Sequence, residues 1–236
     1  MKKVVIAPDS FKGTLSSEQV CDIIASVLSK NYPGVNIISI PVADGGEGTA
    51  EAMLRAIGGK RVYCRAQSPL GRDIEAYYVM LDDKTAVVES ALASGITLEK
   101  KNDPLRASSY GTGQLIKAAL DGGAKSIFVA IGGSAMTDAG MGCLSALGVK
   151  FYGRDGQALY PCGESLEAIR RIDLDGLDKR IAGVKITVFC DVKNPLYGRQ
   201  GAAYIYAAQK GADENGVKLL DRGLENFARL CAVLFS

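Results

Sequence analysis

Apolar residues in the first sixty positions alternate between short continuous runs and helical spacing. Val4–Ala7 and Val35–Val42 are short apolar runs, which are typical of buried strands. Residues 16–28 carry apolar side chains three or four positions apart, and residues 46–57 form a second such stretch that ends at a glycine pair. Because two strand–loop–helix units follow one another, the sequence predicts an α/β fold that begins with a parallel sheet.

The pattern changes at about residue 61, where strands are predicted without helices between them. Residues 61–66, 74–81 and 85–89 alternate or run apolar, and the short links between them contain turn residues. Links this short favour antiparallel pairing of the three strands. We therefore expect a domain boundary near residue 66.

Helices and strands alternate again in the rest of the chain. The predicted elements are helices at residues 113–120, 139–147 and 213–234 and strands at residues 126–131 and 186–190. Residues 1–65 are thus expected to begin one α/β domain, and residues 66–236 to form a second, mixed α/β domain.

Composition narrows the classes of function. The chain has 236 residues, of which 47% are hydrophobic and 23% charged, as in ordinary soluble globular proteins. The formal net charge is only +2, and neither sign forms a long block, so neither a nucleic acid nor a membrane is expected as a partner. No apolar run is long enough for a secretion signal or a membrane span, so a cytoplasmic location is expected.

The types of reactive side chain are also restricted. The six cysteines lie far apart, without the two-residue spacing of zinc or redox motifs, and are expected to be reduced. Histidine is absent from the chain, which excludes Ser-His and Cys-His catalysis and metal sites with histidine ligands. Any catalysis must therefore use carboxylates, lysines, hydroxyls or backbone dipoles.

The first candidate loop, residues 9–15, follows the first predicted strand, where open α/β sheets place their ligands. Ser10, Lys12 and Thr14 could hold a phosphate or a carboxylate, assisted by the N-terminal amides of the next helix. That helix is expected to begin at Ser16, which forms a capping-box pattern with the glutamine three positions later. A solvated strand-to-helix turn is the alternative.

The second candidate loop, residues 41–49, places two carboxylates among three glycines at the end of the next strand. Gly45 and Gly46 would let backbone amides approach a ligand closely. Asp44 and Glu47 could hold Mg²⁺ or orient a substrate hydroxyl. The alternative is that Asp44 only caps the following helix.

The third candidate loop, residues 131–142, is rich in small residues between a strand and a helix, which is the arrangement expected for cradling phosphates. Gly132, Gly133, Ser134 and Asp138 are its candidate ligand residues. The loop lacks the spacing of a Walker A motif and fits the dinucleotide fingerprint poorly. Tight packing of the strand against the helix is the alternative.

The fourth candidate loop, residues 190–196, follows an apolar strand with a carboxylate, Asp191. Asn194 could contact substrate or only make a turn, and Lys210 could bind an anion or only lie at the surface. The segment Gly111–Gly113 is a weaker candidate. Together the loops are rich in glycine, acids and lysine without histidine, which suits phosphoryl transfer better than hydrolysis or redox chemistry.

In this order the loops resemble the motifs of the type I glycerate kinase family. The matching segments are Ala7-Pro-Asp-Ser-Phe-Lys-Gly-Thr14, Val42-Ala-Asp-Gly-Gly-Glu-Gly-Thr49, Gly111-Thr-Gly113, Gly132-Gly-Ser-Ala135, Cys190-Asp-Val-Lys-Asn-Pro-Leu196 and Gln209-Lys-Gly-Ala212. The resemblance implies ATP-dependent phosphorylation of D-glycerate, commonly at the 2-hydroxyl, with Mg²⁺. It also implies two α/β domains around a cleft, one of them flavodoxin-like and discontinuous in sequence.

The resemblance suggests roles for the candidate residues. Lys12 and Lys210 are expected to bind anionic groups. Asp44 or Asp191 is expected to position the glycerate hydroxyl or to hold Mg²⁺, and the choice between them stays open. Residues 132–134, with Asp138, are expected to line the nucleotide phosphates.

The sequence also departs from the family. Family members continue through a Pro-Gly-Ala-Gly-Ala type of segment and a Gly-Glu-Gly-Arg motif, neither of which occurs here. The returning half of the flavodoxin-like domain is therefore expected to be missing. Two alternatives follow: an inactive fragment that binds nucleotide or substrate, or a kinase for a related small hydroxy acid. An incomplete sheet would expose an unpaired strand edge, so homo-oligomers are expected.

Overall fold

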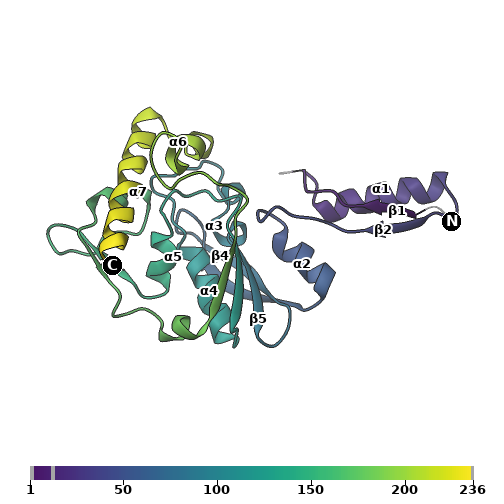
Figure 1. Ribbon diagram of the computed structural model, residues 1–236, viewed down its shortest axis with the longest axis horizontal. Coiled ribbons are helices and arrows are strands. Elements are labelled where there is room, and N and C mark those ends of the chain that lie inside the picture. Colours follow the sequence, from purple (N-terminus) through teal and green to yellow (C-terminus); the bar gives the residue numbers. More distant parts are fainter. Residues whose placement is uncertain (1–2, 12–13, 235–236) are drawn as a thin grey trace.

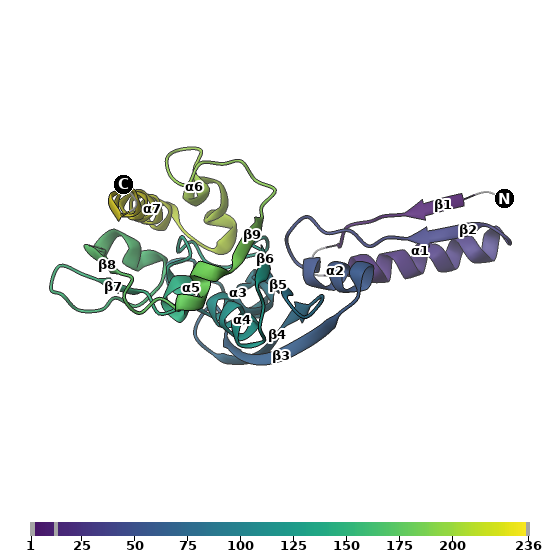
Figure 2. The ribbon, with the colours of Figure 1, turned by 60° about the horizontal axis from the view of Figure 1, so that its bottom comes forward.

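The N-terminal strand, helix and strand form a small unit of their own. The computed structural model describes residues 3–11 and 14–234, and its first elements are β1 (Lys3–Ile6), α1 (Ser17–Asn31) and β2 (Asn36–Ser39). The two strands pair in parallel, with Lys3 opposite Asn36, which confirms the predicted pairing. Figure 1 shows this unit extending away from the rest of the molecule, and Figure 2 shows α1 running alongside the two strands.

The start of α1 is fixed by its own side chains. The Ser16 hydroxyl accepts a hydrogen bond from the Gln19 amide (3.1 Å), and the Gln19 side chain accepts one from the Ser16 amide (2.9 Å). The predicted capping box is therefore confirmed. Because two of the free amides at this helix start are satisfied within the box, fewer remain for a ligand.

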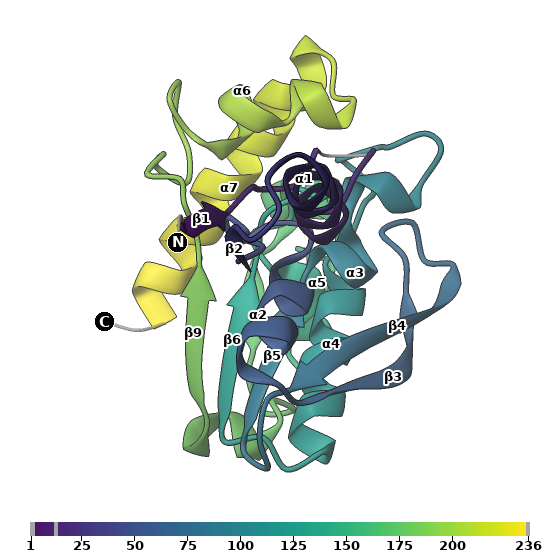
Figure 3. The same cartoon turned by 90° about the vertical axis from the view of Figure 1, so that its right-hand side faces the viewer.

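Helix α2 (Thr49–Ile57) connects the small unit to the larger sheet. It begins three residues later than predicted, because Gly48 has a φ of 90°, a left-handed conformation that cannot be part of the helix. Ala50 of this helix packs against Val79 and Val87 of the larger sheet. Helix α2 therefore covers one face of that sheet, as Figure 3 shows.

The larger sheet has five strands in the order β3-β4-β5-β6-β9. They are β3 (Lys60–Gln67), β4 (Asp73–Met80), β5 (Thr85–Glu89), β6 (Ser126–Ala130) and β9 (Lys185–Phe189). The predicted antiparallel pairing of the first three strands is confirmed, whereas β5, β6 and β9 pair in parallel. The boundary expected near residue 66 falls inside β3 and stays a prediction.

Helix α4 (Tyr110–Asp121) covers the opposite face of the sheet. Its Leu115 is fully buried in a core cluster with Val88 and Ile127. A side chain at Gly111 would overlap the Gln67 carbonyl oxygen, and one at Gly113 would overlap the Cys143 carbonyl. These two glycines therefore allow close packing of the helix.

The C-terminal third packs around a second core. Its elements, together with the short helices elsewhere, are α3 (Ala91–Ser94), α5 (Met141–Ala146), β7 (Lys150–Tyr152), β8 (Arg171–Asp173), α6 (Ala202–Tyr206), α7 (Glu214–Leu234) and the 3-10 helices η1 (Ile96–Leu98), η2 (Gly163–Ala168), η3 (Lys179–Gly183) and η4 (Ala208–Lys210). The long helix α7 inserts Leu220, Leu224 and Phe227 against Phe151. The sequences of the antiparallel pair β7–β8 and of helices α3 and α6 show no regular spacing of apolar residues. The sequence analysis therefore did not predict these elements. Across residues 3–11 and 14–234, we find no helix that could span a bilayer.

Candidate active site

The carboxyl ends of three parallel strands lie at one level of the larger sheet. Glu89, the last residue of β5, pairs with Ala130 at the end of β6, which in turn pairs with Phe189 at the end of β9. The loops that follow these strands therefore start side by side at one edge. In open α/β sheets this edge is where ligands bind.

Residues 42–49, which we call the acid-and-glycine loop, touch the loop after β6 through their backbones. The Gly132 amide donates a hydrogen bond to the Gly45 carbonyl (2.9 Å). A Cβ atom at Gly132 would lie only 2.6 Å from the Gly46 Cα atom, so a larger residue would push the two loops apart. The structure thus brings together three of the predicted ligand-binding glycines.

Asp44 and Asp191 line one cavity of about 640 Å³ between α2 and the end of β9. The Asp44 carboxylate also accepts a hydrogen bond from the Gly46 amide (3.0 Å), which fixes its loop. Asp191 is exposed and lines the same cavity. These two predicted catalytic carboxylates therefore face a common space.

The next question is whether these two carboxylates could bind a magnesium ion. Among the residues that the structure describes, no group of three or more aspartate, glutamate or cysteine side chains gathers to form a metal site. Mg²⁺ is usually held by only one or two carboxylates together with substrate phosphates. Asp44 and Asp191 fit that mode of binding.

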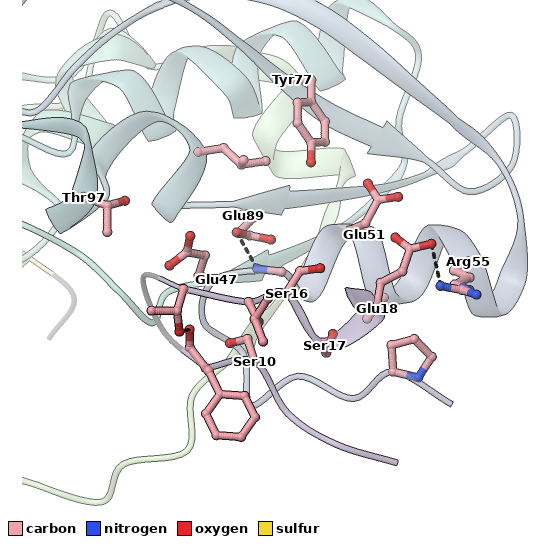
Figure 4. A pocket seen from close by; sticks show the side chains of 17 residues that line it. Ser10, Ser16, Ser17, Glu18, Glu47, Glu51, Arg55, Tyr77, Glu89 and Thr97 are labelled. Atoms are coloured by element: carbon pink, nitrogen blue, oxygen red, sulfur yellow. Dashed lines mark hydrogen bonds and ion pairs between the residues drawn. The ribbon is translucent and has the colours of Figure 1, made fainter. Parts of the chain in front are cut away.

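A second cavity, of about 530 Å³, is lined by other residues of the acid-and-glycine loop. Ser10 and Glu47 line it, and Figure 4 shows their side chains together with those of Ser16 and Glu89. The Val42 amide donates to the Pro8 carbonyl (3.1 Å), so the first two candidate loops are neighbours. The predicted catalytic residue Lys12 lies outside the described residues.

Glu89 borders the second cavity and was missed by the sequence reasoning. It is only 1% exposed, and its carboxylate accepts hydrogen bonds from the Gly48 and Ala50 amides, both at 2.9 Å. Burial raises the pKa of the Glu89 carboxyl, and the two amide bonds partly oppose that rise. A carboxylate ending the apolar run of residues 85–88 was the available signal in the sequence.

Lys210 is anchored to the loop after β6. Its ammonium group donates to the Ser134 hydroxyl (3.0 Å) and to the Met136 carbonyl (2.7 Å). Burial lowers the pKa of Lys210 to about 8, and the nearby charge of Asp138 works against this shift. Two predicted ligand-binding residues, 76 positions apart, are thus in direct contact.

Asp138 is buried within the same loop, with 1% of its surface exposed. One carboxylate oxygen accepts from the Ser109 amide (2.8 Å), the Ser109 hydroxyl (2.7 Å) and the Gly142 amide (3.1 Å). The other accepts from the Gly140 amide (3.0 Å). These bonds make Asp138 an internal anchor of the loop, and its contact with nucleotide phosphates stays a prediction.

Two further predicted residues occupy loops at the same edge. The Asn194 amide group donates to the Gln200 carbonyl (3.0 Å), and its side-chain oxygen accepts from the Tyr206 hydroxyl (2.6 Å). Gly133 has a φ of 71°, and its carbonyl accepts from the Ile96 amide (2.9 Å). Both residues shape loops next to the candidate site, and their contacts with substrate stay predictions.

The sequence of this chain was compared with those of known proteins, and it matches one family. A model of the glycerate kinase family matches residues 4–235. The chain belongs to the glycerate kinase family. Glycerate kinase of Bacillus cereus is 42% identical over 231 residues, and glycerate 2-kinase of Escherichia coli is 43% identical over 231 residues. The resemblance inferred from the motifs is therefore confirmed.

The similarity covers nearly all of this glycerate kinase family chain but only part of its relatives. Each of the two alignments covers 97% of the chain and 61% of the relative, so the chain spans about three fifths of their length. A crystal structure assigned as a glycerate kinase 2 from Salmonella typhimurium superimposes with a TM-score of 0.84 at 41% identity. That match covers 98% of this chain and 63% of the other, and it confirms the predicted α/β class.

Proposed function

We propose that this protein carries out the ATP-dependent phosphorylation of D-glycerate, with 2-phosphoglycerate as the product. The observation that carries the proposal is the contact between the two glycine loops, in which the Gly132 amide binds the Gly45 carbonyl. This contact places the acid-and-glycine loop, with Asp44 and Glu47, beside the loop after β6. Lys210 is hydrogen-bonded to that second loop. Phosphoryl transfer depends on such positioning and on neutralisation of charge.

Each group in the proposed site has a role that its surroundings support. Gly132 and Gly133 carry no side chain that would keep a phosphate away from the backbone. Lys210, held against Ser134, supplies positive charge near that loop. With a pKa of about 8, most of its ammonium groups are charged at neutral pH, so it can attract the nucleotide phosphates.

Asp44 and Asp191 would hold Mg²⁺ together with the phosphates, since both line one cavity. When bound, the ion would neutralise charge that develops on the transferred phosphoryl group. Either carboxylate could instead orient the glycerate hydroxyl and accept its proton. The cavity they share has room for a small hydroxy acid beside a phosphate.

A coupled assay of ADP release tests the proposal directly. Wild-type protein is expected to release ADP from ATP only when D-glycerate is present, and Asp44→Asn and Asp191→Asn are each expected to lower kcat by a factor of about 100 or more. Asp83→Asn is the matched control, because Asp83 is exposed at the opposite end of β5. Near-normal rates in both site variants would contradict the assignment.

Two alternatives give different results in the same experiment. A fragment that only binds nucleotide or substrate would show a thermal shift with Mg-ATP but no release of ADP. A kinase for another small hydroxy acid would favour that acid over D-glycerate in a substrate panel. Identification of the phosphorylated hydroxyl by ³¹P–¹H correlation NMR would test 2-phosphoglycerate as the product.

A further inference from the structure

We propose that Glu89 is a positioning residue of the candidate active site. In this role its buried carboxylate, at the end of β5, holds the acid-and-glycine loop against the larger sheet. The inference rests on the function proposed above, because it gives Glu89 importance through the residues that it orients. Sequence reasoning did not single out this residue.

The contacts of Glu89 reach across the fold. One carboxylate oxygen accepts from the Gly48 amide and the other from the Ala50 amide, each at 2.9 Å. These donors lie 41 and 39 positions away in the sequence. Because both oxygens of a planar carboxylate are bound at once, the side chain fixes the direction of the loop as well as its distance from the strand.

Helix α2 needs this carboxylate because it has no cap of its own. The residue at its N-cap position is Gly48, which has no side chain to accept the first free amides. Glu89 satisfies the amide of Ala50, the second residue of the helix. A negative charge at this end of a helix is also favoured by the helix dipole.

The position of Glu89 connects this cap with the proposed chemistry. Gly48 directly follows the segment that contains Asp44, Gly45 and Glu47. The other end of that segment is held by the bond between Gly45 and Gly132. The end of strand β5 and the loop after β6 therefore each hold one part of the acid-and-glycine loop. Loss of the Glu89 bonds would release the stretch from Gly46 to Gly48, and the Gly46 amide of this stretch is the group that binds the Asp44 carboxylate.

The burial of Glu89 supports a role beyond capping. A local serine, threonine or aspartate would cap a helix without placing a charge in the interior. Glu89 is 1% exposed, and burial of a carboxylate costs free energy that the two amide bonds only partly offset. What the buried glutamate provides, and a local cap cannot, is a fixed link between the helix and the sheet edge.

The test combines amide exchange with kinetics in the variant Glu89→Gln. The glutamine side chain turns one acceptor into a donor, so one of the two amide bonds is lost. We expect hydrogen exchange to become at least tenfold faster at the amide that loses its acceptor, either Gly48 or Ala50. We also expect kcat to fall at least tenfold while KM for ATP changes less than threefold. Glu75→Gln, an exposed glutamate on β4, is the control and is expected to change neither measurement.

Unchanged exchange at both amides, or unchanged kcat in an active protein, would overturn the proposal. If wild-type protein phosphorylates no glycerate, the proposed function fails by itself, and the exchange rates still decide whether Glu89 holds the loop.

If Glu89→Gln does not fold, a titration of the wild type replaces it. The chemical shifts of the Gly48 and Ala50 amides and of the Glu89, Glu47 and Glu51 carboxyl groups are then followed against pH. The two amide shifts are expected to change with the same midpoint as the Glu89 carboxyl. Different midpoints would overturn the link.

Discussion

The N-terminal unit and the five-stranded sheet differ in how far their apolar side chains are buried. In the five-stranded sheet, Val79, Val87 and Ile127 are fully buried. In the N-terminal unit, by contrast, Val5 is 57% exposed and Val27 is 54% exposed. Both regions nevertheless carry apolar residues at regular strand or helix spacing.

The difference lies in what covers each sheet. Helices α2 and α4 cover the two faces of the larger sheet at its central strands, so apolar side chains of β4, β5 and β6 are removed from water, whereas Val188 on the edge strand β9 is 52% exposed. In the N-terminal unit, α1 lies alongside the two strands, as Figure 2 shows. Periodicity in a sequence therefore predicts an element, whereas burial depends on a second surface.

The largest effect is expected from a cavity in the core of the larger sheet. Leu115→Ala removes a fully buried side chain of α4, and such losses cost about 2–5 kcal/mol of unfolding free energy. Urea denaturation followed by circular dichroism measures this change. A loss below about 1 kcal/mol would show that the two regions differ less in packing than their burial indicates.

The junction between the two regions is tested by Gly132→Ala. The added methyl group would lie 2.6 Å from the Gly46 Cα atom, so the two glycine loops must separate. Overpacking of this kind costs about 1–3 kcal/mol. Gly183→Ala is the matched control, since a methyl group there meets no atom within 4 Å. Equal stability of the two variants would argue against a tight junction.

The pH dependence of stability tests the burial of the Lys210 ammonium group. Its pKa is about 8 in the folded protein but near 10.5 when unfolded, so between these values only the unfolded chain holds the proton. The free energy of unfolding should therefore rise with pH in this window.

Relative to Lys210→Met, whose side chain does not titrate, the free energy of unfolding of the wild type should rise by roughly 2 kcal/mol between pH 7.5 and 10. Denaturation at several pH values measures the difference, and parallel curves for the two proteins would contradict the low pKa. Lys218→Met removes an ordinary exposed lysine and serves as the control.

The smallest effect is expected at the exposed face of α1. Val27→Ser should change the unfolding free energy by less than about 0.5 kcal/mol, because the side chain is mostly exposed and the two residues have similar helix propensities. A loss above about 1 kcal/mol would mean that this face is covered in solution. Light scattering on the wild type would then test the predicted homo-oligomers, and a monodisperse monomer would contradict them.

Local contacts were the part of the fold that the sequence could predict. The capping box of Ser16 and Gln19 spans three positions, and the three antiparallel strands are joined by short links. The late start of α2 was missed, because the left-handed conformation of Gly48 depends on its surroundings.

The candidate site was predicted in part, since its loops follow strand ends that the apolar runs reveal. The contact between Lys210 and Ser134 joins residues 76 positions apart, and the bond from Gly48 to Glu89 joins residues 41 positions apart. No periodicity specifies such distant pairs. The sequence therefore provided candidate residues, and only the folded chain could separate cavity-lining Asp44 from the internal anchor Asp138.

The close packing around α4 also limits how the family can diverge. Gly111 and Gly113 bring the helix backbone against the carbonyls of Gln67 and Cys143. A relative with a larger residue at either position must also shift the segment that faces it. Substitutions at these glycines are therefore expected to covary with changes in β3 or α5, which a deep alignment of homologous sequences can reveal.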